Sequence, residues 1–301
     1  TFCIASMAGT STIITAFEPI ATLEAMQNKR VSLVLLVPTM VNMVVNHPEA
    51  GNYDLSSLQD VLYGASPMPE AVINKAMEVI PNAGFHQAYG QTEAGPVLTM
   101  LGPERHVTDG PLAGKMKSAG QAIPGVEVCI VDEDDNEMPP DTVGEICGRG
   151  ENVMLGYWNQ TEMSAETLRN GWLHTGDGGR MDEDGFVYVV DRVKDMIISG
   201  GENVYSAEVE NAIYQHPGVA ECAVIGVPDD KWGERVHAIV HLHDGQNLGE
   251  EQIIEHCQQL IAGFKCPRSV EFKAEPLPLS GAGKILKAQL REPYWEGHEK
   301  Q

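Results

Sequence analysis

The chain is poor in basic residues. Among its 301 residues, 20 are lysine or arginine and 43 are aspartate or glutamate, which gives a formal net charge of −23. Recognition of nucleic acid requires an excess of basic groups, and an anionic membrane surface repels so acidic a chain. Apolar runs of the roughly 20 residues that a spanning helix needs are also missing. We therefore expect no nucleic-acid partner and no membrane span.

Cysteine pairs at the spacing of metal or redox motifs are missing as well. The six cysteines are Cys3, Cys129, Cys147, Cys222, Cys257 and Cys266. Their scattered positions resemble neither a disulfide framework nor a zinc site, and they favour a reducing compartment, the cytoplasm. The chain starts without methionine, and the apolar stretch 1–17 lacks the basic residues of a leader. We expect the chain to be a fragment of a longer protein.

The remaining composition, 43% hydrophobic and 21% charged, is that of a globular protein with a sizeable core. At about 150 residues per domain, the length predicts two domains. The first part of the chain alternates predicted strands (31–37, 61–63, 85–88) with predicted helices (39–46, and 69–80 beginning at Pro69). This alternation predicts βαβ units in a parallel sheet, and the apolar run 31–37 suits a strand buried on both faces.

A different sequence pattern follows, with short β-rich runs at 126–131, 143–147 and 186–190. They are separated by acidic, turn-forming clusters at 132–136 and 182–185, which suit hairpin connections. A metal site is the alternative for these clusters, although turn chemistry accounts for them. The pattern predicts a small antiparallel sheet or β-barrel-like subdomain over about 120–191.

The last part of the chain predicts a compact α+β module. Its expected elements are a helix over 206–215, strands over 219–227 and 234–242, a helix over 250–261 and a strand over 269–273. We place the domain boundary at 191–194. The predicted organisation is thus an α/β domain over 1–191 with its β-rich part, followed by a small α+β domain over 192–301.

The segment Tyr89-Gly90-Gln91-Thr92-Glu93 comes at the end of a predicted parallel strand, where open α/β sheets bind ligands. Thr92 offers a hydroxyl and Glu93 a carboxylate, a pair that suits phosphate and Mg²⁺. Taken alone, the pentapeptide favours an ordinary loop with a capping threonine and glutamate.

Three further segments carry polar residues with two interpretations each. Asp177, in His174-Thr175-Gly176-Asp177, could accept both hydroxyls of a ribose or begin an Asp-Gly turn. The charged segment 191–203 contains Gly200-Gly201, which allow close approach of a ligand, but it also suits an interdomain linker. Lys284 follows a glycine-containing loop that is not a Walker A sequence. It could stabilise charge on a phosphoryl group or be a solvated surface lysine.

Together, the order and spacing of these motifs resemble the adenylate-forming superfamily of acyl-CoA synthetases, peptide-synthetase adenylation domains and beetle luciferases. The resemblance extends from about Glu18 to about Arg291. Its most specific parts are YGQTEAGP (89–96), residues 171–210, residues 216–238 and PLSGAGKILKAQLR (278–291). The family joins a carboxylic acid to ATP as an acyl-adenylate, releases pyrophosphate, and then transfers the acyl group to a thiol. The resemblance implies ATP, Mg²⁺, CoA and a small-molecule carboxylic acid.

At the nucleotide, the resemblance implies roles for matching positions. Glu93 would hold Mg²⁺, and Thr92, after Gly90-Gln91, would contact phosphate. The Gly64-Ala65-Ser66 turn and Tyr89 would flank the adenine.

In the ribose and acyl region, Asp177 and Arg192 would bind the ribose hydroxyls. Lys284 would approach the α-phosphate and the acyl carboxylate during adenylation, where a cation favours the meeting of two anions. The nearby Lys287 is expected to be structural.

The resemblance also implies that the small C-terminal domain is mobile. Lys194 matches the family's hinge position, at which a few residues absorb a large rotation between the half-reactions. The rotation would withdraw Lys284 and bring Gly200 and Gly201 to the access path of the CoA thiol.

The chain departs from the family in one respect: the glycine-, serine- and threonine-rich phosphate loop is missing. Gly9-Thr10-Ser11-Thr12 is only superficially similar, and we interpret it as a local turn. Without the first half of the large domain, the strands at 31–37 and 61–63 should expose edges and apolar faces. We expect little or no ligase turnover from these residues alone.

Only small, uncharged residues indicate which kind of carboxylic acid the site would accept. Ala65 and Ala94-Gly95 are predicted to leave space without a charged anchor, which favours a fatty or other hydrophobic acid over an amino acid. An aryl acid is the nearest rival, ahead of the peptide-synthetase and luciferase activities. A non-catalytic, nucleotide-binding remnant is the alternative of a different class.

Overall fold

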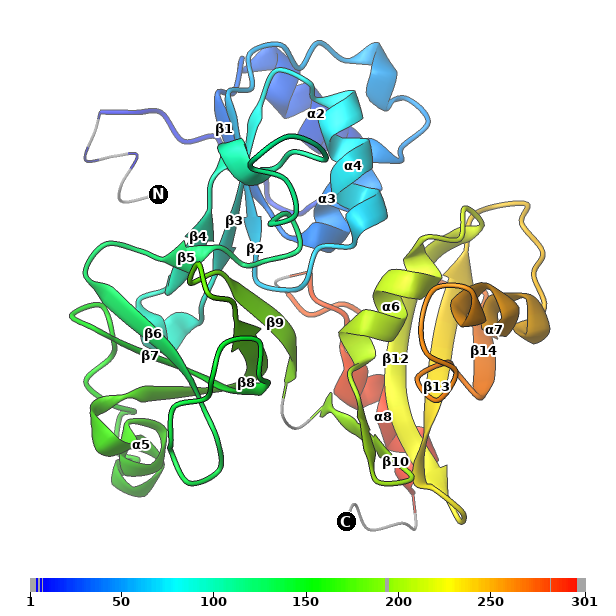
Figure 1. Cartoon of the computed structure of the whole chain (residues 1–301). Coiled ribbons are helices and arrows are strands. Elements are labelled where there is room, and N and C mark those ends of the chain that lie inside the picture. Colours follow the sequence, from blue (N-terminus) through cyan, green and yellow to red (C-terminus); the bar gives the residue numbers. More distant parts are fainter. Residues whose placement is uncertain (1–3, 5, 7, 193–194, 282, 297–301) are drawn as a thin grey trace.

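The computed structural model describes residues 4, 6, 8–192, 195–281 and 283–296. They form three sheets in two neighbouring parts of the molecule. The first two sheets run from blue to green in Figure 1, and the third lies beside them in yellow-green to orange. No helix of these residues is long and apolar enough to cross a membrane. The predicted fold class, α/β followed by α+β, is confirmed.

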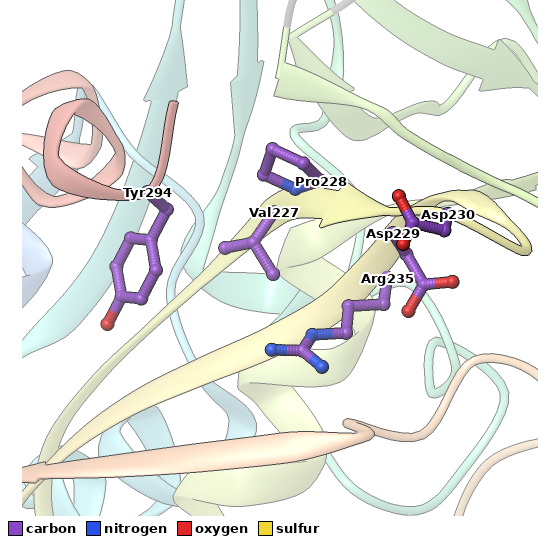
Figure 2. A pocket seen from close by; sticks show the side chains of 6 residues that line it. All are labelled: Val227, Pro228, Asp229, Asp230, Arg235 and Tyr294. Carbon is purple, nitrogen blue, oxygen red and sulfur yellow. The ribbon is translucent and has the colours of Figure 1, made fainter. Parts of the chain in front are cut away.

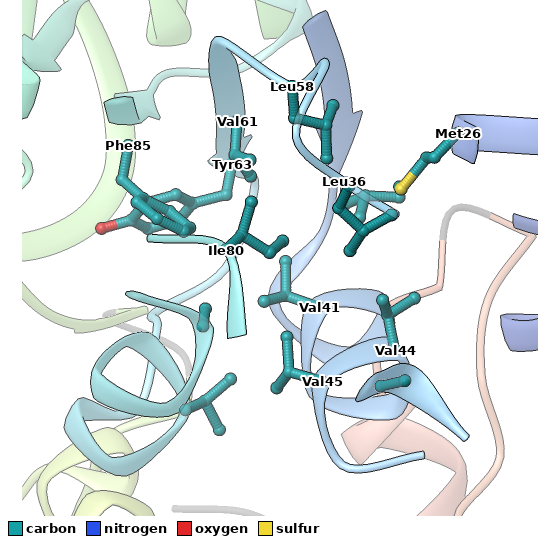
Figure 3. Close-up of a cluster of buried hydrophobic side chains, with 14 of the residues drawn as sticks. Met26, Leu36, Val41, Val44, Val45, Leu58, Val61, Tyr63, Ile80 and Phe85 are labelled. Carbon is teal, nitrogen blue, oxygen red and sulfur yellow. The ribbon is translucent and has the colours of Figure 1, made fainter. Parts of the chain in front are cut away.

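The first sheet has the order β1 (Leu33–Leu36), β2 (Asp60–Gly64), β3 (Gly84–Tyr89), β4 (Thr99–Leu101), β5 (Gln121–Ala122). The first three strands are parallel, as predicted, and β4 and β5 continue the sheet antiparallel. The accompanying helices are α2 (Pro19–Asn28), α3 (Pro38–Val45) and α4 (Glu70–Val79). Figure 3 shows Val41, Val44 and Val45 of α3 packing toward Leu36 and Val61 of the sheet. Pro69 is the N-cap of α4 rather than its first residue.

Strand β1 lies at the edge of this sheet, and its two faces differ. Leu36 is buried, whereas Leu33 and Leu35 are 45% and 66% exposed. The prediction of burial on both faces is wrong for this chain, because among the described residues the helices cover only one face. The expected exposure of an apolar face at this strand is confirmed.

The second sheet is antiparallel, in the order β6 (Val126–Val131), β7 (Gly144–Gly150), β8 (Leu173–Met181), β9 (Val187–Arg192), with helix α5 (Thr161–Thr167) between β7 and β8. Strand β8 was not predicted, because its glycines resemble a turn. In the described chain this sheet does not close into a barrel. Instead β9 exchanges backbone hydrogen bonds with Ala119-Gly120, which lead into the first sheet.

The third sheet has the order β11 (Glu202–Val204), β10 (Ile197–Ser199), β13 (Gly233–Leu242), β12 (Val219–Asp229), with β14 (Ser269–Lys273) parallel to β13. Its helices are α6 (Ser206–Tyr214), α7 (Glu250–Gln258) and α8 (Lys287–Trp295). The predicted strands and the first two helices are present. The β10–β11 hairpin and α8 were not predicted, and α8 contains Pro293, which argues against a helix.

Polar contacts continue across the predicted domain boundary at 191–194, of which residues 193–194 lie outside the described residues. The Asp191 carboxylate accepts a hydrogen bond of 2.6 Å from the backbone N–H of Ser206 at the start of α6. An acidic group at a helix N-terminus is favourable. Lys287 Nζ lies 2.6 Å from Ser206 Oγ and 2.7 Å from Glu210 Oε1. These contacts support the structural role expected for Lys287.

We expect Lys287→Met to lower the free energy of unfolding by about 3 kcal/mol, because it leaves the Glu210 carboxylate largely buried without its cation. Urea unfolding measures the change. Lys273→Met, which removes a more exposed ion pair with Glu271, should cost less than about 1 kcal/mol. Equal losses in the two variants would contradict the structural role of Lys287.

Candidate functional site

The carboxyl ends of β2 and β3 lie side by side. Gly64 pairs with Ala88 across the two strands, and a Cβ at Gly64 would lie 2.1 Å from the Ala88 carbonyl oxygen. Only glycine permits this approach. The next residue, Ala65, has a φ of +72°. The register therefore brings the Gly64-Ala65-Ser66 turn next to Tyr89, as the predicted adenine site requires.

Asp177 of β8 is the buried carboxylate of the site. Its Oδ2 accepts a hydrogen bond of 2.9 Å from the Tyr89 hydroxyl, and Arg192 Nε lies 3.5 Å from its Oδ1. Thr175 Oγ1 lies 3.3 Å from the Tyr89 hydroxyl and accepts the backbone N–H of Asp177 at 3.1 Å. Burial raises the pKa of Asp177, while the Tyr89 hydrogen bond and the charges of Arg192 and Lys284 act against that rise. Asp177 is part of a strand, so the alternative of a simple Asp-Gly turn is wrong.

Lys284 lies in the loop between β14 and α8, close enough to Asp177 for the two charges to interact. The Ser280 N–H donates to the Lys284 carbonyl at 2.7 Å, and the Lys284 N–H donates to Ser280 Oγ at 3.1 Å. Burial lowers the pKa of Lys284, the nearby Arg192 lowers it further, and Asp177 raises it. The structure thus brings Lys284, Asp177 and Arg192 within electrostatic reach of one another.

Gly283 seats this loop on the first part of the molecule. The Thr39 hydroxyl of α3 donates to the Gly283 carbonyl. A Cβ at Gly283 would lie 2.9 Å from Met40 Cε and 3.0 Å from Val37 Cγ2, and its φ is +76°. A side chain at this position would lift the loop, and Lys284 with it, away from α3.

Glu93 lies in the short helix η2 (Thr92–Ala94) that follows β3. Its Oε1 accepts a hydrogen bond of 2.8 Å from the Tyr157 hydroxyl, and its backbone carbonyl accepts the N–H of Met154 at 2.8 Å. These contacts hold the carboxylate in place. A single fixed carboxylate suits Mg²⁺, which takes few protein ligands and completes its shell with water and phosphate.

The packing around η2 fixes its backbone and fills the space beside it. A Cβ at Gly90 would lie 2.3 Å from the Pro96 carbonyl oxygen, so Gly90 allows the chain to fold back after Tyr89. Ala94 is fully buried, and a Cβ at Gly95 would lie 2.4 Å from the Asn152 carbonyl oxygen. The interpretation that Ala94 and Gly95 leave space for an acyl tail is therefore wrong, because protein atoms occupy that space.

Gly200 and Gly201 have no described contact with the other predicted residues. Gly200 and Gly201 form the β10–β11 turn, with φ of +64° and +84°. The Gly200 N–H donates to the Trp232 carbonyl at 2.8 Å, and a Cβ at Gly201 would meet no atom within 4 Å. The described contacts of this turn are within the third sheet. Lys194, the predicted hinge, lies outside the described residues.

Three contacts of the site were missed at the level of sequence. Thr175 lies inside a recognised motif, but only its position beside Tyr89 shows its role. Tyr157 comes from a loop between β7 and α5. Glu145 of β7 accepts the backbone N–H of Gly176 at 2.9 Å and so fixes the chain before Asp177. Their spacing along the chain carries no signal, because each depends on the pairing of separate strands.

Figure 2 shows a cavity elsewhere, of about 350 Å³. It is lined by Val227, Pro228, Asp229, Asp230, Arg235 and Tyr294. None of these side chains belongs to the predicted site. The chemistry of the candidate site therefore rests on the buried carboxylate and its cations: Asp177 can accept hydrogen bonds from a diol, and Lys284 can neutralise an anion held beside it.

Comparison with known proteins gives two family matches. The family described as AMP-binding enzyme matches residues 1–158, and AMP-binding enzyme C-terminal domain matches residues 208–284. A feruloyl-CoA synthase from Amycolatopsis sp is 43% identical over 95% of this chain and 56% of its own length. Medium/long-chain-fatty-acid–CoA ligase FadD8 from Mycobacterium tuberculosis is 38% identical over 96% of this chain and 51% of its own length.

A solved structure shows the same fold. ATP-bound MatB from Rhodopseudomonas palustris superimposes with a TM-score of 0.84 at 31% identity, over 97% of this chain and 56% of the other. The chain thus spans about half the length of the curated relatives it matches.

Tyr89→Phe should raise the pKa of Asp177 further, because a hydrogen bond that stabilises the ionised carboxylate is lost. A carboxyl-carbon NMR titration measures this pKa. Tyr188→Phe removes a phenol that donates to Asp182 instead, and it should leave the titration of Asp177 unchanged. An unaltered pKa of Asp177 in Tyr89→Phe would contradict the geometry described.

Proposed function

Because this chain belongs to the AMP-binding enzyme family, we propose that it carries the adenylate site and the C-terminal domain of an ATP-dependent acid–CoA ligase. The observation that supports this most is the meeting of Lys284 with Asp177 and Arg192. Asp177 and Arg192 lie on β8 and β9 of the second sheet, and Lys284 comes from the loop between β14 and α8, beyond the predicted domain boundary. Such a convergence is what a reaction between a nucleotide and a second anion requires.

The proposed reaction has two steps. The carboxylate of the acid attacks the α-phosphorus of ATP, the bond to pyrophosphate breaks, and an acyl-adenylate forms. The CoA thiol then loses its proton and attacks the acyl carbon, so that a thioester forms and AMP leaves. In the first step Lys284 places a positive charge between two anions, which lowers the barrier by positioning and electrostatics.

The remaining residues bind and orient the nucleotide in this proposal. Asp177 and Arg192 hold the ribose hydroxyls. The Gly64-Ala65-Ser66 turn and Tyr89 flank the adenine, whose face stacks on the phenol ring. Burial raises the pKa of Tyr89, so the phenol stays protonated and continues to donate to Asp177.

The phosphate side of the site is assigned to the segment after β3. Gly90-Gln91 lead into Thr92, whose exposed hydroxyl contacts phosphate. Glu93 holds the Mg²⁺ that accompanies ATP, with its other oxygen kept in place by Tyr157.

The second step needs a different arrangement of the C-terminal domain. Gly200 and Gly201 lie in a turn with open space at Gly201, which suits passage of the pantetheine arm close to the backbone. We propose that rotation about Lys194 exchanges Lys284 for this turn at the reaction centre.

The free thiols of Cys129, Cys147, Cys222, Cys257 and Cys266 support a reducing compartment, the cytoplasm.

The proposed substrate is a hydrophobic carboxylic acid. A fatty acid is favoured by the resemblance of the chain to fatty-acid–CoA ligases, FadD8 among them. An aryl acid is the second candidate, supported by the higher identity to the feruloyl-CoA synthase. A nucleotide-binding chain without catalysis is the alternative of a different class.

Pyrophosphate release from ATP and Mg²⁺ tests the function with a panel of fatty, aryl and amino acids, with and without CoA. The chain is measured beside a version extended upstream through a phosphate loop. We expect acid-dependent release from the extended version and little from the 301 residues. Full-rate release from the short chain would refute the need for the loop, and no release from either would refute the ligase.

In the extended version, Lys284→Ala should slow adenylation by more than about 100-fold, as expected for loss of a charge that stabilises the transition state. Thioester formation from a supplied acyl-adenylate should change little. Lys273→Ala, on an exposed lysine of the same domain, is the matched control. Equal losses in both half-reactions would refute the assignment of Lys284.

The pH range over which adenylation is fast should be narrower at both its acidic and its alkaline end. Burial raises the pKa of Asp177, so its carboxylate becomes protonated, and the rate falls, at a higher pH than for an exposed aspartate. Burial lowers the pKa of Lys284, so its positive charge is lost, and the rate falls, at a lower pH than for an exposed lysine. Lys284→Arg should shift the alkaline limb upward, because arginine stays protonated. An unchanged alkaline limb would show that another group controls it.

A further inference from the structure

The second sheet holds a group of side chains to which the proposed reaction assigns no contact with substrate: Glu145, Cys147 and His174. The other carboxylate oxygen of Glu145 accepts the Gly176 N–H before Asp177. Glu145 and Cys147 are two residues apart on β7, a spacing that places side chains on the same face of a strand. Cys147 pairs with His174 on β8. The pairing of β7 with β8 thus gathers an oxygen, a sulfur and a nitrogen donor, although no spacing motif in the sequence indicates it.

The oxygen of Glu145 and the sulfur of Cys147 both lie close to the third donor, Nδ1 of His174. Glu145 Oε2 lies 2.8 Å from this nitrogen and Cys147 Sγ lies 3.3 Å from it. All three atoms lie within 4.8 Å of one another. A single N–H points well at only one acceptor, whereas a cation between the three atoms would contact all of them.

We propose that Glu145, Cys147 and His174 form a binding site for a Zn²⁺-type cation, with water as the fourth ligand. Tetrahedral zinc with these donors keeps ligand atoms about 3.3–3.6 Å apart, so the Glu145 oxygen and the Cys147 sulfur each need to move away from the His174 nitrogen by about 0.5 Å or less. The His174 side chain is 4% exposed and that of Glu145 is 21% exposed. Water therefore reaches the site from the Glu145 side.

The donor set also selects the kind of cation. Thiolate and imidazole ligands favour zinc and similar transition metals, whereas Mg²⁺ and Ca²⁺ prefer sites made of oxygen alone. The site is thus distinct in chemistry from the one proposed at Glu93.

The surroundings provide a second layer of contacts. Asp135 Oδ1 lies 3.8 Å from Nε2 of His174, on the side of the ring away from the donors. Metal-binding histidines commonly find a carboxylate there. Arg169 lies 3.4 Å from Glu145 Oε2 but 3.0 Å from Asp135, so it keeps its closer partner when a cation takes the Glu145 oxygen.

Coordination by Cys147 requires the thiolate, so binding of the cation releases the thiol proton.

Titration of the chain with Co²⁺, a spectroscopic substitute for Zn²⁺, tests the site. We expect the charge-transfer absorption of a thiolate–cobalt bond, abolished by an equivalent of Zn²⁺ and unaffected by Mg²⁺. Cys147→Ser should remove this absorption and weaken Co²⁺ binding by more than about 100-fold, because loss of a group that merely orients a ligand already costs about 10–100-fold. Cys266→Ser, at a buried thiol of the third-sheet part, should retain both.

Glu145→Gln provides a second variant with nearly the same shape. It should keep the absorption but weaken Co²⁺ binding by at least about 10-fold, and circular dichroism confirms that each variant is folded. No charge-transfer absorption in the unaltered chain, or the same absorption in folded Cys147→Ser, would overturn the proposal. No nucleotide, acid or CoA is present, so the outcome is independent of the proposed ligase activity.

Discussion

The burial of the Asp177 carboxylate is the constraint on which the candidate site depends. A carboxylate removed from water is costly unless donors and cations surround it. Tyr89 approaches it from the end of a parallel strand, Arg192 from the end of β9, and Lys284 from the loop before α8. The Asp177 carboxylate thus interacts with residues from both of the parts of the molecule that are seen in Figure 1. Close backbone packing at Gly64 holds β2 against β3, whereas a side chain at Gly283 would meet the Met40 and Val37 side chains of the first part.

The two parts otherwise keep separate hydrophobic cores. One cluster of buried residues lies around α3, α4 and the first sheet, and others lie entirely within the third sheet and its helices. Individual hydrogen bonds join them, such as Asn42 Nδ2 to the Ala220 carbonyl at 3.0 Å and the Glu70 N–H to Asn211 Oδ1 at 3.1 Å. Each such bond contributes only about 1 kcal/mol net. An interface of this kind can be broken without unfolding either core, which is the property that a rotation between two half-reactions requires.

The limits of prediction from sequence follow from the range of the interactions involved. Local patterns identified β2, β3 and α4, and a recognised motif identified Asp177 and Lys284, because these depend on residues close in the chain. Strand β8 escaped prediction because its backbone is held by pairing with β7 and β9, which overrides the turn preference of its glycines. The space expected beside Gly95 is filled by Asn152, a distant residue. The exposure of Leu35 likewise depends on what covers the strand, which the apolar run itself does not encode.

The distribution of charge bears on which part of a nucleotide the proposed site would bind. The chain carries a net charge of −23, so anionic ligands bind only where local cations outweigh this background. At Asp177 these cations are Arg192 and Lys284, and Lys284 is assigned to the α-phosphate. Within this sequence, no glycine-rich loop supplies the backbone N–H groups that normally cradle the outer phosphates. The proposed contacts therefore recognise adenosine and the first phosphate. In the proposed reaction, the charge of pyrophosphate would need the partners that such a loop supplies.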